Sequence, residues 1–241
     1  MTIWNTWHGC HRKSPGCLNC YMYRRDSEYG LDSSIVNKTK SFKDAVKKYR
    51  DGSYAMKKED GVVYICMTSD FFIEEADEWR KEIWSMVKER QDLHFNIITK
   101  RIERFNVSIP EDWNDGYENV TICSTCENQQ MADERLPIFL ELPIKHREII
   151  HEPMLGEIHI EKYLESGKIE QVICGGESGP NARPCNYDWI LNTREQCLKY
   201  NTPFYFKQTG ANFIKDGKTY KVERKNQMKQ AHKANIDISK I

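Results

Sequence analysis

The sequence lacks the features that mark membrane, disordered and highly charged proteins. It has no excess of either charge, because 36 Lys and Arg side chains balance 36 Asp and Glu side chains. No apolar run is long enough to cross a bilayer. The composition, 39% hydrophobic and 30% charged, lacks the shortage of core residues seen in disordered chains. We therefore expect a folded protein with no membrane partner, and one that does not coat nucleic acid by total charge alone.

The first residues also lack a basic segment followed by an apolar stretch, the pattern of a secretion signal. We therefore expect a cytoplasmic protein. Its nine cysteines then indicate thiols kept reduced for metal ligation or burial, because disulfides rarely persist in that compartment.

Compact apolar runs and helical spacings alternate along the chain. Residues 62–66 are an apolar run, as expected for a buried parallel strand, and residues 74–90 repeat apolar side chains every three to four positions, as an amphipathic helix does. About seven repetitions of strand then helix predict an α/β fold with a parallel sheet, here a single (β/α) barrel, complete or partial. The predicted strands are 3–7, 62–66, 93–98, 119–123, 147–151, 172–174 and 204–206, and the predicted helices are 21–29, 74–90, 132–142 and 188–200.

Residues 211–241 break this alternation. They contain eight Lys and Arg side chains against three Asp and Glu, with few large apolar residues. One interpretation is a solvated, partly frayed tail or a short hairpin. The other is a basic arm that contacts a phosphate backbone. We therefore predict a barrel domain over 1–210 and a basic C-terminal extension over 211–241.

The chain is organised around a cysteine segment, residues 9–21. Cys17 and Cys20 have the two-residue spacing that lets both thiolates reach one ion or cluster, and Cys10 can fold back as a third ligand. Three thiolates on an iron-sulfur cluster leave one iron open, whereas a closed zinc site needs four protein ligands. Because His8 or His11 could supply the fourth, the spacing leaves cluster and zinc open.

Other motifs follow the cysteine segment in order along the chain. They are Asp70, Thr99-Lys100-Arg101, Glu127-Asn128-Gln129, Ala132-Asp133-Glu134-Arg135, Glu152-Pro153, Gly175-Gly176-Glu177-Ser178-Gly179-Pro180, Ala182-Arg183-Pro184 and Phe206-Lys207-Gln208. Together with Trp4-Asn5-Thr6-Trp7 and the cysteine segment, they resemble a phage and bacterial three-Cys-motif family grouped with the radical S-adenosylmethionine (SAM) enzymes, in the branch that contains spore photoproduct lyase. The common radical SAM motif has three residues between its first two cysteines, whereas this chain has six, a longer loop that the family shares.

The resemblance implies a radical SAM-like barrel with the cluster loop after its first strand. It implies a 4Fe-4S cluster on Cys10, Cys17 and Cys20, whose open iron binds SAM. One electron then cleaves SAM to a 5′-deoxyadenosyl radical, which abstracts a hydrogen atom. The recurrence of the family in phages, and its likeness to a branch with DNA photolesion repair, suggest a nucleic acid or nucleotide substrate. A reductase or partner protein is a further candidate partner.

The first group of candidate SAM-binding residues follows the second and third predicted strands. By the resemblance, Asp70 and Ser69 would meet the SAM ammonium, and Lys100 or Arg101 could meet its carboxylate. A carboxylate after a strand also often caps the next helix, so Asp70 has a structural alternative.

The second group follows the fourth and sixth predicted strands. Glu127 and Asn128 could accept from ribose hydroxyls, and Gly175 with Gly176 would let the backbone approach a flat base. Glu177 completes a Gly-Gly-Glu sequence. The radical SAM motif of that composition follows the second strand, so its usual role is not carried over here.

Further polar residues at strand ends could bind substrate or donate a proton. His151 and Glu152 lie at the end of one strand and Lys207 at the end of the last, and salt bridges inside the barrel are the alternative. Arg183 lies in a rigid turn, where it could hold a phosphate or carboxylate or serve the turn alone. Tyr21, beside the last cysteine, could shield the cluster.

Cys123 and Cys126 form a second two-residue spacing. With Cys66 and Cys174, also at predicted strand ends, they could complete an auxiliary metal site, but buried cysteines often pack as small hydrophobic residues.

Taken with the resemblance, the cysteine segment and the polar residues at strand ends favour a radical SAM enzyme. The alternative is a zinc-binding, nucleic-acid-binding protein without redox chemistry, and a third is an inactive barrel that serves as a partner subunit.

Overall fold

A computed structural model describes residues 2–239. The chain forms two compact units, each described by itself below. The first unit consists of Met1–Lys13, Met22–Cys123 and Leu142–His146, and the second of Ser14–Tyr21, Ser124–Glu141 and Arg147–Ile241. The cysteine segment is therefore divided: Cys10 belongs to the first unit, whereas Cys17 and Cys20 belong to the second.

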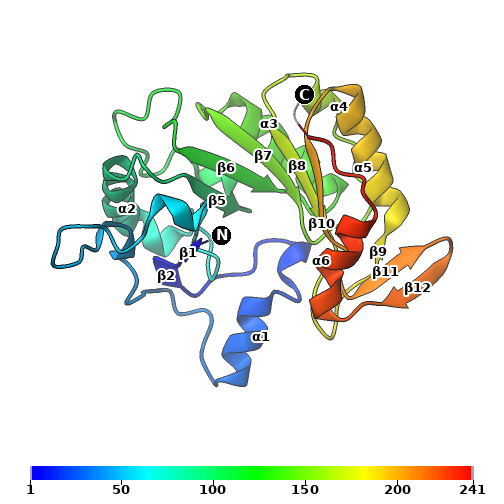
Figure 1. Cartoon of the computed structure of the whole chain (residues 1–241), viewed down its shortest axis with the longest axis horizontal. Helices are drawn as coiled ribbons and strands as arrows, with labels where there is room; N and C mark the ends of the chain where they lie inside the picture. Colours follow the sequence, from blue (N-terminus) through cyan, green and yellow to red (C-terminus); the bar gives the residue numbers. More distant parts are fainter. Residues whose placement is uncertain (1, 240–241) are drawn as a thin grey trace. The chain divides into compact units, whose positions relative to one another are not determined.

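Seven strands form one sheet in the order β1-β4-β5-β6-β7-β8-β10 (Figure 1). The pairs β1–β4, β4–β5, β7–β8 and β8–β10 are parallel. This confirms the predicted α/β fold with a parallel sheet. Within residues 2–239 no pairing returns from β10 to β1, so the sheet is open, as in the partial form of the prediction. The strands are β1 (Thr2–Trp4), β4 (Val63–Ile65), β5 (Phe95–Thr99), β6 (Val120–Thr125), β7 (His146–His151), β8 (Gln171–Gly175) and β10 (Phe204–Gln208).

The core of the first unit lies between its strands and α2 (Asp77–Glu89). α2 buries Ile83, Trp84 and Val87 along one face. Two acidic residues in its first turn interact favourably with the positive end of the helix dipole. The buried, β-branched centre of β5 packs on the same core. The other elements here are β2 (Trp7–His8), β3 (Asn37–Lys38), most of α1 (Tyr21–Glu28) and four 3-10 turns, Asp44–Val46, Lys58–Asp60, Glu74–Ala76 and Ile102–Arg104.

The second unit pairs β7, β8 and β10 with helices on the strand connections. β7 and β8 are in register from Glu148↔Gln171 to His151↔Cys174, so their last residues end side by side. Loops that follow parallel strands converge at this end of a sheet, where α/β proteins build their sites. The helices of this unit are α3 (Gln129–Glu141), α4 (Glu161–Leu164), α5 (Tyr187–Lys199) and α6 (Arg224–Lys233).

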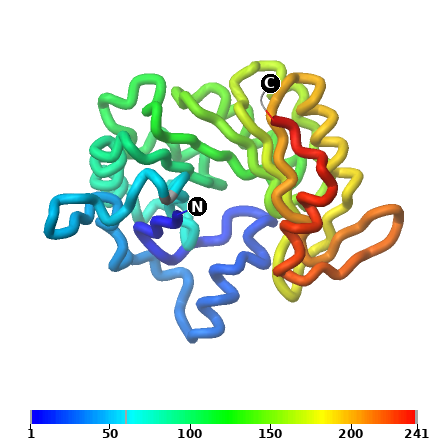
Figure 2. The backbone as a smooth tube through the Cα atoms, in the orientation of Figure 1, coloured from blue at the N-terminus to red at the C-terminus, as the bar shows by residue number. Residues whose placement is uncertain are grey.

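Within residues 211–239, the second unit forms a hairpin and a helix. A small sheet of order β12-β11-β9 contains the antiparallel hairpin of β11 and β12, and α6 packs along β10 (Figure 2). The expected short hairpin is therefore present. The other expectation for this segment, a partly frayed tail, is wrong for the residues of α6, which form a helix. The strands are β9 (Cys185–Asn186), β11 (Asn212–Lys215) and β12 (Lys218–Lys221).

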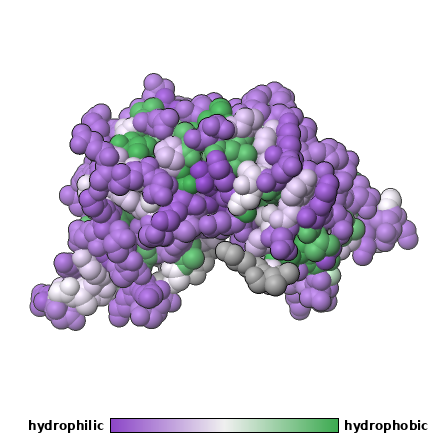
Figure 3. All heavy atoms as spheres, turned by 90° about the horizontal axis from the view of Figure 1, so that it is seen from above, coloured by the Kyte–Doolittle hydropathy of each residue, from purple (hydrophilic) through white to green (hydrophobic). Residues whose placement is uncertain are grey.

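The surface is predominantly hydrophilic on the face shown in Figure 3. No helix within residues 2–239 is long and apolar enough to span a membrane.

Candidate functional site

The cysteine loop, residues 14–21, is a short turn that leads into α1. Pro15 starts a 3-10 turn, Pro15–Cys17, where its fixed φ and missing N–H suit the first helical position. The backbone N–H of Cys17 donates to the Ser14 carbonyl (2.9 Å), and that of Cys20 to the Cys17 carbonyl (3.4 Å). Cys17 is the last residue of the 3-10 turn, and Cys20 follows three residues later. Cys17 is buried, Cys20 is half-buried, and neither is in a disulfide.

The carboxylate of Glu127 holds the start of the cysteine loop. Glu127 follows β6 and has no exposed surface. Its Oε1 accepts hydrogen bonds from the Ser14 hydroxyl and the Gly16 N–H (2.8 Å), and its Oε2 accepts one from Arg135 on α3 (2.9 Å). A Cβ atom on Gly16 would lie 3.0 Å from the carboxylate, so this close approach favours glycine. The Arg135 ion pair offsets the desolvation of the buried charge.

A second carboxylate, Glu177, holds the rest of the loop. Asn19 donates to Oε2 of Glu177 (2.9 Å). Arg183 donates to Oε2 from its backbone N–H (2.8 Å) and Nε (2.9 Å), and to Oε1 from Nη2 (2.5 Å). Nη1 of Arg183 also donates to the Pro15 carbonyl (3.0 Å). Although burial alone would raise the pKa of Glu177, these bonds lower it, so the group is a carboxylate at neutral pH.

Several predicted ligand-binding residues are thus used inside the second unit. Both oxygens of Glu127 and of Glu177 receive donors from the chain itself, and Arg183 meets Glu177 rather than an open space. Oδ1 of Asn128 accepts from the Met131 N–H (2.9 Å) at the start of α3. The ribose and anion contacts proposed for these side chains stay predictions.

Gly175 and Gly176 also allow close contacts within the chain. A Cβ atom on Gly176 would clash with the carbonyl of Thr209, and one on Gly175 would lie 3.1 Å from Glu152 and 3.2 Å from Gln208. The missing side chains therefore permit close approach of the chain's own backbone and carboxylate. Whether a base also lies against them stays a prediction.

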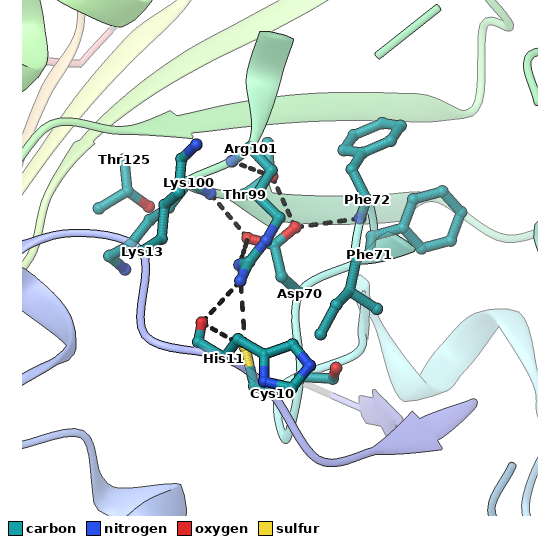
Figure 4. A network of polar contacts seen from close by, with 12 residues as sticks. Cys10, His11, Lys13, Asp70, Phe71, Phe72, Thr99, Lys100, Arg101 and Thr125 are labelled. Atoms are coloured by element: carbon teal, nitrogen blue, oxygen red, sulfur yellow. Dashed lines mark hydrogen bonds and ion pairs between the residues drawn. The ribbon is translucent and has the colours of Figure 1, made fainter. Parts of the chain in front are cut away.

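In the first unit, Asp70 joins the ends of β4 and β5 (Figure 4). Its Oδ1 accepts from the Phe72 N–H (3.0 Å) and the Thr99 hydroxyl (2.7 Å), and its Oδ2 accepts from the Lys100 N–H (2.9 Å). Arg101 lies 3.4 Å from Oδ2 as an ion pair. The structural alternative named for Asp70 is therefore present, with the carboxylate ordering the two loops after these strands.

Arg101 connects this carboxylate to the first cysteine. Its Nη1 lies 3.8 Å from Sγ of Cys10, and its Nη2 donates to the His11 carbonyl (2.6 Å), as Figure 4 shows. Arg101 is largely buried. A buried guanidinium beside a thiol stabilises the thiolate, the form that binds metal and attacks electrophiles.

Ser69 and Lys100 complete the predicted set in this unit. The Ser69 hydroxyl donates to the Gly9 carbonyl (2.5 Å), which ties the cysteine segment to the end of β4. Lys100 uses only its backbone N–H for Asp70. Within residues 2–239, its side-chain ammonium makes no hydrogen bond or ion pair, and the residue is half-buried.

The two histidines proposed as a fourth zinc ligand each contact a carboxylate. Nε2 of His8 lies 3.0 Å from Asp26, and Nε2 of His11 contacts Glu75. Zinc-bound histidines use one ring nitrogen for the metal and hold the other with a carboxylate of this kind.

The strand-end residues of β7 and β10 form a separate polar group. Glu152 accepts from Nζ of Lys207 (2.6 Å) and from the side-chain amide of Gln208. The salt bridge named as the alternative role is therefore present. Burial, followed by the negative charges of Cys20 and Glu152, raises the pKa of Tyr21 to about 12, with Arg224 acting in the opposite direction. Tyr21 thus stays protonated beside this group.

His151 is fully buried and makes one hydrogen bond. Its Nδ1 donates to the Cys126 carbonyl (2.6 Å), and its Nε2 is enclosed without a hydrogen-bond partner among the described residues. Burial lowers the pKa of His151 from 6.5 to about 4. The imidazole is therefore neutral at physiological pH and closed off from solvent.

The cysteines of the suggested auxiliary site lie in the core. Burial raises the pKa of the Cys66 thiol to about 12 and that of Cys174 well above its usual value, so both stay protonated. Cys123 and Cys126 are also buried. In the part of the chain that the structure describes, no group of three or more His, Cys, Asp or Glu residues is arranged to hold a metal ion. Packing explains these four cysteines.

Comparison with known proteins places the chain in a family. No curated protein and no solved structure matches it. The family described as "Protein of unknown function (DUF5131)" matches residues 1–237. Because this match takes in both the cysteine segment and the strand-end polar residues, the chain belongs to the DUF5131 family.

Proposed function

We propose that the protein is a radical SAM-type enzyme that holds a 4Fe-4S cluster on Cys10, Cys17 and Cys20. The observation that carries this proposal is the pair of carboxylates, Glu127 and Glu177, that fix the cysteine loop. Burying a charge is unfavourable unless it is paired and hydrogen-bonded. Two such groups devoted to one short loop indicate that the position of its thiols matters, as it does for metal ligands.

The chemical type of the donors supports an iron-sulfur cluster, although the described residues contain no assembled group of three ligands. Three thiols outside any disulfide are available, two of them on one turn. Arg101 beside Cys10 favours its thiolate form. Soft thiolate ligands select iron-sulfur clusters or zinc over magnesium and calcium.

The chain's own residues would bind and orient the small molecule. The Lys100 ammonium, which has no partner within residues 2–239, is suited to the SAM carboxylate, and Asp70 keeps the loop that carries Lys100 in place. A 4Fe-4S cluster held by these thiols would pass one electron, restored by a low-potential reductase, to SAM and so supply the chemistry that cleaves SAM to methionine and a 5′-deoxyadenosyl radical. We propose a nucleic acid or nucleotide as the substrate that would lose a hydrogen atom.

Zinc is the second candidate because of the histidine–carboxylate pairs. Asp26 on His8 and Glu75 on His11 would hold either ring with its Nδ1 available for a metal. Under this alternative the protein is colourless and binds nucleic acid without redox chemistry.

Anaerobic purification followed by iron, sulfide and zinc analysis separates the two candidates. The cluster predicts brown protein with about four irons and an electron paramagnetic resonance signal, after dithionite reduction, that shifts when SAM is added. It also predicts 5′-deoxyadenosine and methionine in the reduced mixture. Colourless protein with one zinc, unchanged by iron reconstitution, would overturn the radical SAM proposal.

Two cysteine variants supply the matched comparison. Cys17→Ala should lose both the cluster and SAM cleavage. Cys197→Ala removes a buried thiol on α5, away from the loop, and should keep both. Equal retention of cluster and cleavage in the two variants would contradict the assignment of Cys17 as a ligand.

A further inference from the structure

Positive charge is concentrated in the C-terminal part of the second unit. Residues 211–241 carry eight Lys and Arg against three Asp and Glu, which leaves 28 basic against 33 acidic side chains in residues 1–210. The chain is neutral as a whole only because these two parts cancel. Such segregation creates a local positive potential that the net charge conceals.

The basic residues lie on a projecting hairpin and the helix after it. The turn between β11 and β12 uses Asp216 and Gly217, both with positive φ (51° and 70°), as a tight hairpin turn requires. All four residues of β12 are exposed, so this strand is a solvent-facing edge. Two residues then connect β12 to α6, so the hairpin and the helix follow each other closely along the chain (Figures 1 and 2).

Two charge placements here are unfavourable in the protein alone. Lys215 and Lys218 are direct cross-strand partners, where like charges repel. Arg224 stands in the first turn of α6, which has no acidic residue there, although the helix dipole disfavours cations at that end. Both placements become favourable when an anion binds.

Most of these cations lack acidic partners. Lys225 pairs with Glu223 (3.0 Å). By contrast, lysines elsewhere often pair with carboxylates, as Lys81 does with Glu78. Within residues 2–239, six cations of this surface have no ion pair within 4 Å: Lys215, Lys218, Lys221, Arg224, Lys229 and Lys233.

The remaining side chains favour nucleic acid over a lipid surface. Tyr220, on β12 between Lys218 and Lys221, is 47% exposed. An exposed aromatic ring among cations is the arrangement that stacks on bases of single-stranded nucleic acid. A membrane-binding helix needs an apolar face, whereas α6 buries only Gln227 and Ala231 and exposes a single large apolar residue.

We infer that the hairpin and α6 form a surface that binds the phosphate backbone of single-stranded nucleic acid, with Tyr220 stacking on a base. The surface lies outside the cysteine loop, and its binding needs neither metal nor SAM. Its test is therefore independent of the proposed enzymatic function.

Fluorescence anisotropy with a labelled oligonucleotide of about 20 nucleotides, titrated from about 50 to about 300 mM salt, tests this surface. Each single-strand phosphate contact adds about 0.7 to the slope of log Kd against log salt. The triple variant Lys215→Gln, Lys218→Gln, Lys221→Gln should therefore lower the slope by about 2. Tyr220→Ala should weaken binding by roughly fivefold or more with the slope unchanged, because stacking is independent of salt.

The matched control removes three paired lysines elsewhere: Lys81→Gln, Lys162→Gln and Lys199→Gln. It changes the net charge equally and should keep the wild-type slope. The inference is overturned by no binding at about 50 mM salt, or by equal loss in the control. It is also overturned if anionic phosphatidylserine vesicles, and no oligonucleotide, are bound through the hairpin lysines. Thermal melting of each variant checks that the exposed substitutions leave the fold intact.

Discussion

Replacing Ser14 by alanine should open the cysteine loop locally and expose Cys17 to thiol reagents. The Ser14 hydroxyl donates to Oε1 of Glu127. Gly16 and Arg135 keep their hydrogen bonds to the same carboxylate in this variant. The change therefore removes one donor without leaving a buried charge unpaired.

The magnitude follows from the charge on the acceptor. A hydrogen bond to a charged group contributes about 1.5 to 3 kcal/mol. Cys17 is 9% exposed, so a reagent reaches its thiol chiefly through local opening of the loop. If opening becomes easier by that amount, the labelling rate of Cys17 rises by about 10- to 100-fold, because 1.4 kcal/mol corresponds to a factor of ten.

Iodoacetamide labelling of metal-free protein, followed by mass spectrometry of the Cys17 peptide, measures this rate. Ser166→Ala is the matched control, since the Ser166 hydroxyl donates to the Tyr163 carbonyl (2.7 Å) in the same unit but away from the loop. It should leave Cys17 labelling at the wild-type rate.

Glu127→Gln is the stronger form of the same change. Glutamine presents an NH2 group either to the Gly16 N–H or to Arg135, and breaking a buried ion pair costs about 3 to 5 kcal/mol. In a chain of this length we expect the melting temperature to fall by roughly 10 °C. Wild-type labelling in Ser14→Ala together with an unchanged melting temperature in Glu127→Gln would refute the idea that this carboxylate holds the loop.

Three further outcomes follow from named contacts. The unfolded chain protonates His151 near pH 6.5 and the folded chain near pH 4, so the free energy of unfolding decreases as the pH is lowered through that window. Denaturation should show that this free energy is about 2 kcal/mol lower by pH 5, and His151→Asn should lack this loss. Arg101→Gln removes the cation beside Cys10 and should slow alkylation of that thiol by roughly three- to tenfold. An alkylation rate that depends on pH in the same way in the variant and in the wild type would contradict this role. Gly176→Ala should destabilise the protein by on the order of 3 kcal/mol in urea unfolding, because its methyl group meets the Thr209 carbonyl, and wild-type stability would rule out that clash.

The strands and long helices could be predicted because each carries its own period. β5 and β6 are nearly continuous buried runs, and α2 repeats its apolar residues on one face. Residues 31–58 carry Phe42, Ala45, Val46 and Tyr49 at roughly helical spacing, yet the structure has only the 3-10 turn Asp44–Val46 among these positions. Spacing on a polar, lysine-rich stretch says little when few of its apolar residues can reach a core.

The C-terminal helix had no such period. α6 buries only Gln227 and Ala231, neither of which is a strong hydrophobic signal. The helix packs along β10 through tertiary contacts, and the spacing of apolar residues in the sequence does not reveal such contacts. The Asp216-Gly217 pair, in contrast, is a strong local signal for a hairpin turn, and it could have located β11 and β12 in advance.

That some candidate residues lie close together was predictable, but the contacts that their side chains make were not. Polar side chains after parallel strands were expected to gather, and Asp70 with Thr99 and Lys100 do so. The donors to Glu127 were not predictable, because Ser14 is 113 positions away in the sequence. Pattern and spacing identify which groups are polar, whereas the pairing of distant groups is set by the fold.

The hydrogen bonds also indicate where a ligand would be recognised. Both carboxylate oxygens of Asp70, of Glu127 and of Glu177 accept donors within their own units, so a ligand that took the lone pairs already in use would displace bonds worth about 1.5 to 3 kcal/mol each. The Lys100 ammonium makes no such bond within residues 2–239, so an anion can bind it without that loss. We therefore propose that support of the cysteine loop and recognition of a ligand fall to different side chains. Substitutions in the first group should act through stability and thiol exposure, and substitution of Lys100 through binding alone.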